Sequence, residues 1–321
     1  MHDIDELPIL VLAYNRFDKF KKCINTLYSQ GVRKIFISID GPKNSLDIKE
    51  QKKIERFCKK NMFEIDFKLN FLQYNNGCRL GPIKGISWFF QQNKYGVVLE
   101  DDVIISNKCL ETFCFLLQKN IYKKNYMSLS SFNEYAINEN EQLYSMPVWR
   151  SWGWATWAEK WIEHINFSEK IKNYNFWKLY NLLPLELRSI ETINLLKASQ
   201  LNLLDAWDYE FNFSHIANNL KSLTIGGINN YVYGFDDSAT HPINLESLDI
   251  DFNLFNKTQI DKSIIKICNY EESNKIMKKC GFFYDHKKYK KNFNFSDLFL
   301  GTIFRLIFFL RIIKRIIFRI L

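Results

Sequence analysis

Three adjacent carboxylates are the feature of this 321-residue chain that most clearly suggests chemistry. Glu100, Asp101 and Asp102 directly follow the apolar run VVL at 97–99. Neighbouring carboxylates repel one another, and a hard divalent cation such as Mg²⁺ or Mn²⁺ would relieve that repulsion while also binding substrate phosphates. A solvated loop or a helix N-cap would explain the same residues without a ligand. Their position directly after a predicted buried strand favours a metal site for phosphate chemistry.

Alternating strands and helices surround this acidic run. The apolar patterns predict strands over 8–13, 34–40, 63–72 and 95–102, and helices over 17–30, 47–60, 81–92 (with Pro82 near its start) and 106–119. Such alternation is typical of an α/β domain with a mostly parallel sheet flanked by helices. Ligands of these sheets bind beyond the carboxyl ends of the strands, where both Asp40 and the acidic run lie. After about residue 121 the alternation loosens, with a tryptophan-dense segment at 145–161, a helical pattern over 162–220 and a loop and strand pattern over 222–242.

Composition excludes several classes of protein. The chain is 47% hydrophobic with 12 Gly and 6 Pro, so it is neither disordered nor fibrous. The seven cysteines include no CxxC pair, which argues against a disulfide framework and a zinc site. The first seven residues carry three acids and no Lys or Arg, unlike a signal peptide. We therefore expect a cytoplasmic protein with reduced thiols.

The net charge of +9 is concentrated near the C-terminal end. Residues 286–321 hold nine of the 44 Lys and Arg residues and one of the 35 acids. On a helix Arg311, Arg315 and Arg319 would share one face and apolar residues the other. No uncharged stretch there approaches the roughly 20 residues that span a bilayer. We expect an in-plane amphipathic helix on an anionic membrane surface, with a helix packed on the domain or on a partner subunit as the alternative.

Four segments stand in order along the chain and carry a resemblance. They are PILVLAYNRFDKFKKCINTL (8–27), ISIDGPKN (37–44), NNGCRLGPIKGISWFFQQNKYGVVLEDDV (75–103), and WRSWGWATWAEKW (149–161) with GFDDSATH (234–241). Together they resemble glycosyltransferases of the GT-A fold from bacterial surface-polysaccharide clusters (family 2-like), with Glu-Asp-Asp in place of Asp-X-Asp. The resemblance implies a Rossmann-like nucleotide-diphospho-sugar transferase domain over 1–245, divided into a nucleotide-sugar-binding half (1–120) and an acceptor half (121–245). An extension (246–285) and the basic tail (286–321) would follow.

The resemblance also assigns roles on the donor side. The residues expected to bind the nucleotide sugar are Ala13, Tyr14, Asn15, Arg16, Asp40, Arg79, Lys84, Glu100, Asp101, Gly153 and Trp154. Among them, the loop 13–16 would frame the base, Asp40 would lie near the uracil or ribose, and the two basic residues of 79–84 could reach the phosphates. Asp102 matches the acid that binds the metal, Mn²⁺ or Mg²⁺, and His241 matches a histidine that often completes the metal shell.

An inverting sugar transfer also needs a base that accepts the proton of the acceptor hydroxyl. The segment DAWDYEF at 205–211 offers Asp208, then Glu210 and Asp205, although all three could be ordinary surface acids. Five of the eight tryptophans lie in 149–161. Core packing explains at least half of them, whereas Gly153 and Trp154 could form a platform for the donor sugar.

The sequence thus predicts a metal-dependent, inverting hexosyl- or N-acetylhexosaminyltransferase that uses a nucleotide sugar, with a UDP-sugar favoured. Its acceptor would be a lipid-linked or glycan chain of a capsule, O-antigen or other surface polysaccharide, at the inner face of the plasma membrane. The alternative is a non-catalytic sugar-nucleotide-binding or scaffold protein of a membrane-bound assembly complex. A nucleotidyltransferase would need a glycine-rich loop after the first strand, which the sequence Tyr14-Asn15-Arg16 lacks. Nucleic acid is not an expected partner, because the chain outside the tail is nearly neutral.

Overall fold

The computed structural model describes residues 4–119, 122–131, 143–147, 149–188, 190–226, 230–232 and 267–268. The chain divides into two compact units, Met1–Asn274 and Lys275–Leu321, and every described residue belongs to the first. His241, most of the segment 234–285 and the tail 286–321 lie outside the described residues. Within the described part of the chain, no helix is both long and apolar enough to span a membrane.

The first half of the described unit is a parallel sheet. Its strands are β1 (Ile9–Ala13), β2 (Lys34–Ile39), β3 (Asp66–Phe71) and β4 (Tyr95–Glu100), in the spatial order β3-β2-β1-β4. All three neighbouring pairs are parallel, and Ala13 pairs with Ile39 while Leu12 pairs with Glu100. The carboxyl ends of β1, β2 and β4 therefore meet at one edge, as the sequence pattern predicts.

The sheet continues past β4 as a mixed sheet. The further strands are β8 (Trp154–Trp157), β6 (Tyr126–Ser130), β9 (Lys221–Ile225), β7 (Leu143–Met146) and β11 (Ile267–Cys268), in that spatial order. β8 is antiparallel to both of its neighbours, whereas β6 and β9 pair in parallel. A separate small ribbon pairs β5 (Val103–Ile105) with β10 (Asn230–Val232). The expectation of a mostly parallel sheet is thus confirmed for β1–β4, and the later strands add antiparallel pairs.

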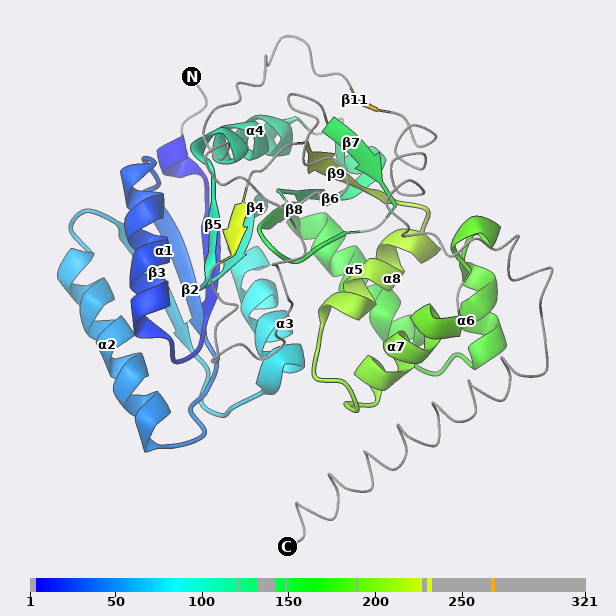
Figure 1. Ribbon diagram of the computed structural model, residues 1–321, viewed down its shortest axis with the longest axis horizontal. Helices are drawn as coiled ribbons and strands as arrows, with labels where there is room; N and C mark the ends of the chain where they lie inside the picture. The colour runs from blue at the N-terminus through cyan, green and yellow to red at the C-terminus, as the bar shows by residue number, and fades with distance from the viewer. Residues whose placement is uncertain are drawn as a thin grey trace, which may run out of the picture. The chain divides into compact units, whose positions relative to one another are not determined.

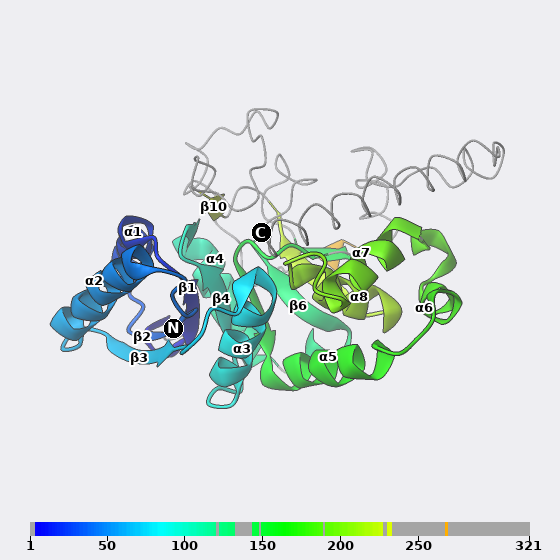
Figure 2. The same ribbon diagram turned by 90° about the horizontal axis from the view of Figure 1, so that it is seen from below.

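Helices cover both faces of the sheet because successive strand residues point to opposite sides. Ile9 and Val11 pack with α1 (Phe17–Ser29), α2 (Ser45–Asn61) and α4 (Asn107–Gln118). Leu10, between them, packs with α3 (Gly77–Phe90), α5 (Ala158–Ile171) and α8 (Asp208–Ala217). Figure 2 shows α1 and α4 on one side of the sheet and α3 and α5 on the other.

A third core lies among the helices that follow the tryptophan-rich segment. It joins the end of α5 and part of α8 to α6 (Phe176–Leu182) and α7 (Ile190–Gln200). In Figure 1 these helices, drawn in green, lie beyond α3 and away from α1 and α2. Short 3₁₀ turns occur at Ile4–Glu6, Tyr122–Lys124 and Leu185–Leu187.

The helix expected over 81–92 is longer than predicted at its N-terminal end. It begins at Gly77, so that Pro82 lies inside the helix rather than near its start. The additional turn is stabilised by tertiary contacts, because the carboxylates of Asp40 and Asp205 accept backbone N–H groups at the start of the helix. Local sequence alone, with two glycines and a proline over 77–82, gives little support for a helix there.

Candidate active site

The acidic run lies where β4 leaves the sheet, beside the end of β1. The backbone N–H of Asp101 donates to the carbonyl oxygen of Leu12 at 3.0 Å, which continues the β1–β4 pairing into the run. Glu100 is half-buried, whereas Asp101 and Asp102 are buried, with 1% and 6% of their surface exposed. The run is therefore not a solvated loop, and its carboxylates need a positive partner.

Arg16 supplies positive charge to this run. Its guanidinium forms an ion pair with Asp101 through Nη2, and its Nη1 lies 2.7 Å from Oδ2 of Asp102. The charges of these two aspartates raise the pKa of Arg16, although burial by itself would lower it. The sequence predicts Arg16 near the nucleotide base, whereas the structure places it against the acids, because β1 and β4 are neighbours in the sheet.

The carboxylates of the run remain hard to ionise together. Burial, followed by the charges of Asp102 and Asp101, raises the pKa of Glu100. Burial also raises the pKa of Asp101, despite the opposing effect of Arg16. The charged forms of Glu100 and Asp101 are therefore disfavoured, and a nearby cation would favour them.

The residues present fit a divalent metal held by Asp102. Oδ1 of Asp102 is buried and has no hydrogen-bond partner among the described residues. A single protein carboxylate together with substrate phosphates and water is a usual ligand set for Mg²⁺. No group of three or more His, Cys, Asp or Glu side chains suited to a metal occurs in the described ranges, and His241 lies outside them.

Asp47 fixes the loop that follows β1. It accepts hydrogen bonds from the hydroxyl of Tyr14 at 2.5 Å and from Nδ2 of Asn15 at 2.7 Å. Burial and this hydrogen bond raise the pKa of Tyr14. Asp47 lies in the first turn of α2, whose N-cap is the side chain of Asn44. Sequence reasoning missed Asp47, and the only signal was an acid within a helix start. Ala13 is buried at the end of β1, directly before this loop.

Asp40, at the end of β2, binds the start of α3. Its carboxylate accepts the backbone N–H groups of Asn76 at 2.9 Å and of Gly77 at 3.0 Å. Asp40 is the expected contact to uracil or ribose, and this arrangement places it beside the first turn of α3. Lys84, two turns further along the helix, donates to Oδ1 of Asn76. Lys84 therefore lies beside the start of α3, near Asp40.

The structure pairs Arg79 with Glu210, two residues for which the sequence predicts separate roles. Nε of Arg79 donates to Oε1 of Glu210 at 2.7 Å, and the two side chains are only 11% and 4% exposed. Glu210 also accepts from the hydroxyl of Ser168 at 2.6 Å. Neither the role expected for Arg79 at a phosphate nor the role expected for Glu210 as a base includes this buried ion pair.

Asp205 is also engaged, at the start of α3. Oδ1 of Asp205 accepts the backbone N–H of Arg79 at 2.7 Å. Gly77 has a φ of +77°, and a Cβ there would lie 2.7 Å from Oδ2 of Asp205, so glycine permits this approach. Asp208 is half-buried in the first turn of α8, and its charge contributes to the raised pKa of Glu100.

The tryptophans of 149–161 mainly build the core. Trp154 is 1% exposed and packs edge-on against Trp149 at a ring-centroid distance of 4.9 Å. Trp207 and Phe211 complete the same aromatic cluster. A sugar could not reach the face of Trp154 without opening this core, so the structure favours packing over the platform expected for Trp154.

Gly153 marks a close approach of the backbone to β5. Its φ is +75°, and a Cβ would lie 2.7 Å from Cγ2 of Ile105. The carbonyl oxygen of Gly153 accepts from both the backbone N–H and the hydroxyl of Ser131, at 2.9 and 2.7 Å. The need for glycine is therefore explained by packing around β5 and Ser131.

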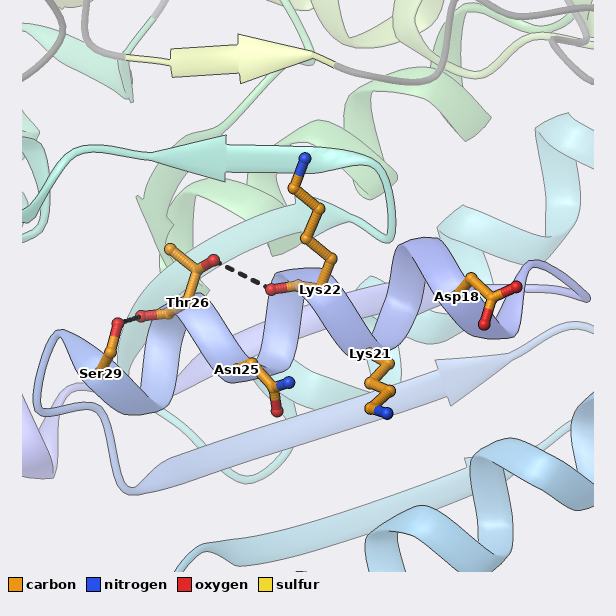
Figure 3. Close-up of a pocket in the computed structure, with 6 residues that line it drawn as sticks. All are labelled: Asp18, Lys21, Lys22, Asn25, Thr26 and Ser29. Atoms are coloured by element: carbon orange, nitrogen blue, oxygen red, sulfur yellow. Dashed lines mark hydrogen bonds between the residues drawn. The ribbon is translucent and has the colours of Figure 1, made fainter.

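A surface pocket lies apart from these residues, on the exposed side of α1 (Figure 3). It is lined by Asp18, Lys21, Lys22, Asn25, Thr26 and Ser29. The hydroxyls of Thr26 and Ser29 donate to carbonyl oxygens of their own helix, at 2.9 and 2.7 Å. None of the predicted site residues lines this pocket, and we assign it no ligand.

No protein-family model matches the chain, and no curated protein sequence matches it. Among solved structures, the chain is similar to mannosyltransferase PcManGT from Pyrobaculum calidifontis in complex with GDP-Man and Mn²⁺, at 9% identity over 66% of this chain and 68% of that chain, with a TM-score of 0.39. It is also similar to UTP-bound UGPase from Acinetobacter baumannii, at 8% identity over 73% of this chain and 90% of that chain, with a TM-score of 0.32. The apo-form glycosyltransferase GlyE of Streptococcus pneumoniae matches at 8% identity over 74% of this chain and 57% of that chain, with a TM-score of 0.30.

Proposed function

We propose that the chain is a metal-dependent glycosyltransferase of the GT-A type that takes its sugar from a nucleoside diphosphate sugar. The observation that supports this proposal best is the buried acidic run at the carboxyl edge of the parallel sheet, where Oδ1 of Asp102 has no hydrogen-bond partner among the described residues. Asp208, in the first turn of α8, also contributes to the raised pKa of Glu100 through its charge. Asp102, with its unpartnered buried oxygen, suits compensation of the leaving diphosphate through a metal. Asp208, which is half-buried, suits removal of the proton from the acceptor hydroxyl.

The chain's own residues supply most of the arrangement. Asp208 would accept the proton of the acceptor hydroxyl through its carboxylate, with inversion at the anomeric carbon. Lys84 would meet a phosphate oxygen, and the loop of Tyr14 and Asn15, fixed by Asp47, would contact the base. Asp102, with His241, would hold Mn²⁺ or Mg²⁺, which when bound acts as a Lewis acid on the diphosphate.

The test is hydrolysis of nucleotide sugars by the purified full chain. A panel of UDP-sugars, with a GDP-sugar for comparison, is incubated with Mn²⁺, and free nucleoside diphosphate is measured. We expect release from at least one donor, lost on addition of EDTA and in Asp102→Asn. Asp66→Asn, which changes an exposed aspartate on β3, is the matched control and should retain the activity. Absence of release from every donor would contradict the proposal.

We further propose that the donor is a UDP-sugar, the transferred group a hexosyl or N-acetylhexosaminyl unit, and the acceptor a lipid-linked or glycan chain of a surface polysaccharide. The basic tail 286–321 supports the choice of acceptor, since a lipid-linked acceptor is presented at a membrane. The protein would then be peripheral, at the cytoplasmic face of the plasma membrane.

A non-catalytic sugar-nucleotide-binding protein of an assembly complex is the second candidate. The buried pairing of Arg16 with the acidic run favours it, because that pairing compensates part of the acid charge without a metal. Binding of UDP and Mn²⁺ by calorimetry without any hydrolysis would support this candidate over the enzyme.

A further inference from the structure

Glu210 anchors the first turn of α8 to three other helices. The carboxylate is 3% exposed. It contacts Arg79 of α3 at 2.7 Å, Ser168 of α5 at 2.6 Å and Ser199 of α7 at 2.8 Å. A buried carboxylate is tolerated where such donors replace water, so its partners fix its place closely. Because Glu210 lies two residues after Asp208, these contacts also fix the turn that carries Asp208.

Arg79 is the counterpart of this anchor on α3. Besides the ion pair to Glu210, its Nη1 donates to Oδ1 of Asn202 at 3.0 Å. Its backbone N–H donates to Asp205 at 2.7 Å. One residue of α3 thus contacts three residues of the segment 202–210, which runs from the end of α7 into α8. These contacts bind the α7–α8 connection to the first turn of α3.

Asp40 also binds the start of α3. The backbone N–H groups of Asn76 and Gly77 donate to the Asp40 carboxylate at the end of β2. The turn therefore lies between an acid of the parallel sheet and the acids that flank Asp208. A shift of α8 relative to α3 would break the contacts of Arg79 with Glu210 and Asn202.

We infer that Arg79 and Glu210 are positioning residues. Their contacts hold Asp208 in a fixed position relative to the residues that would bind the nucleotide sugar. This inference rests on the proposed function, since it assigns Asp208 as the proton acceptor. It differs from a phosphate-binding role for Arg79, because Nε and Nη1 of its guanidinium donate to Glu210 and Asn202. A misplacement of about 1 Å at a reacting group can lower a rate about 100-fold without weakening ligand binding.

The test compares nucleotide binding with turnover in the full chain. The variants are Glu210→Gln and Arg79→Lys, with Ser168→Ala as a milder change that leaves the ion pair in place. Glu163→Gln is the matched control, since it breaks the Lys160–Glu163 pair of 2.7 Å within α5. The Kd of UDP with Mn²⁺ is measured by calorimetry, and kcat and KM by hydrolysis of the best UDP-sugar.

We expect the Kd of UDP to stay within about threefold of wild type in every variant. On the same geometric argument, kcat should fall about 10- to 100-fold in Glu210→Gln and Arg79→Lys, less in Ser168→Ala, and remain unchanged in Glu163→Gln. The inference is wrong if Arg79→Lys and Ser168→Ala both fold and both keep the kcat of the wild type, even if Glu210→Gln fails to fold. A loss of UDP affinity of tenfold or more in Arg79→Lys would also overturn it, because Arg79 would then bind the donor.

A second measurement separates this inference from the proposed function. Hydrogen exchange is followed at the amides of 77–80 and 208–211 in the absence of nucleotide. Arg79→Lys and Glu210→Gln should each speed exchange on both segments, and Glu163→Gln on neither. If the wild type hydrolyses no UDP-sugar, the proposed function fails, but the exchange rates still test whether Arg79 and Glu210 couple α3 to α8. Unchanged exchange on the opposite segment would show that Arg79 and Glu210 do not couple α3 to α8.

Discussion

Replacing Arg16 by methionine should lower the stability of the protein by about 2–4 kcal/mol. Its guanidinium pairs with Asp101 and Asp102, whose side chains are only 1% and 9% exposed. Removal of one partner of a buried ion pair costs about 3–5 kcal/mol, because it leaves a buried charge uncompensated. Arg16 itself is 25% exposed, so solvent recovers part of this cost. Methionine keeps much of the apolar stem, which confines the change to the charge.

Thermal unfolding of the full chain measures this loss. In a domain of 150–250 residues, 1 kcal/mol shifts Tm by about 2–4 °C, so we expect a fall of about 4–16 °C. Lys160→Met is the control, since the Lys160–Glu163 pair has a carboxylate that is 53% exposed and should contribute less than about 1 kcal/mol. Adding Asp101→Asn to Arg16→Met should raise Tm again, because the second change removes a charge that has lost its partner.

Two results would refute this account of Arg16. One is a Tm for Arg16→Met within about 1 °C of wild type. The other is a fall in Tm on adding Asp101→Asn to Arg16→Met that is as large as the fall that Asp101→Asn causes in the wild-type chain. Either would mean that the acidic run does not depend on Arg16 for its compensation.

The other predictions concern the metal, the base, the buried histidines and the tail. Asp102→Asn should abolish both the rise in Tm that Mn²⁺ causes and the hydrolysis of UDP-sugars, and a retained Mn²⁺ shift would place the metal elsewhere. Asp208→Asn should lower kcat about 10²- to 10⁴-fold with an unchanged calorimetric Kd for UDP, and near-normal kcat would exclude Asp208 as the base. Burial lowers the pKa of His215 to about 4 and that of His164 to about 3, so the unfolded chain binds protons that the folded chain does not. Stability should therefore fall below pH 6.5, by up to about 1.4 kcal/mol per pH unit for each histidine. This fall should be smaller in His215→Asn when urea midpoints are compared across pH, and an equal pH dependence in the two proteins would contradict the prediction. Deletion of 286–321 should abolish co-sedimentation with anionic phosphatidylglycerol vesicles at an unchanged Tm, and persistent binding would place the membrane contact in the rest of the chain.

Sequence patterns predicted the first half of the fold well. The strands and helices expected up to residue 119 match β1–β4 and α1–α4, because a buried parallel strand is a short apolar run and the helices between them have a clear apolar period. The same patterns placed Asp40 and the acidic run at strand ends. They did not predict the order of the later strands, since β6–β9 pair across long separations that local periodicity does not encode.

The residue types alone determined that this chain has an acidic motif after a buried strand, a second group of acids at 205–210, and a charge excess confined to its last 36 residues. Only the tertiary structure decided how those acids divide their roles. Arg79 comes from a helix more than 120 residues earlier and contacts Glu210 and Asp205, two of the three acids that the sequence offers as the base. Arg16 likewise reaches Asp101 and Asp102 because β1 and β4 are neighbours in the sheet. The ionisation and availability of a side chain depend on charges within a few ångströms, and those neighbours are set by packing and strand order rather than by position along the chain.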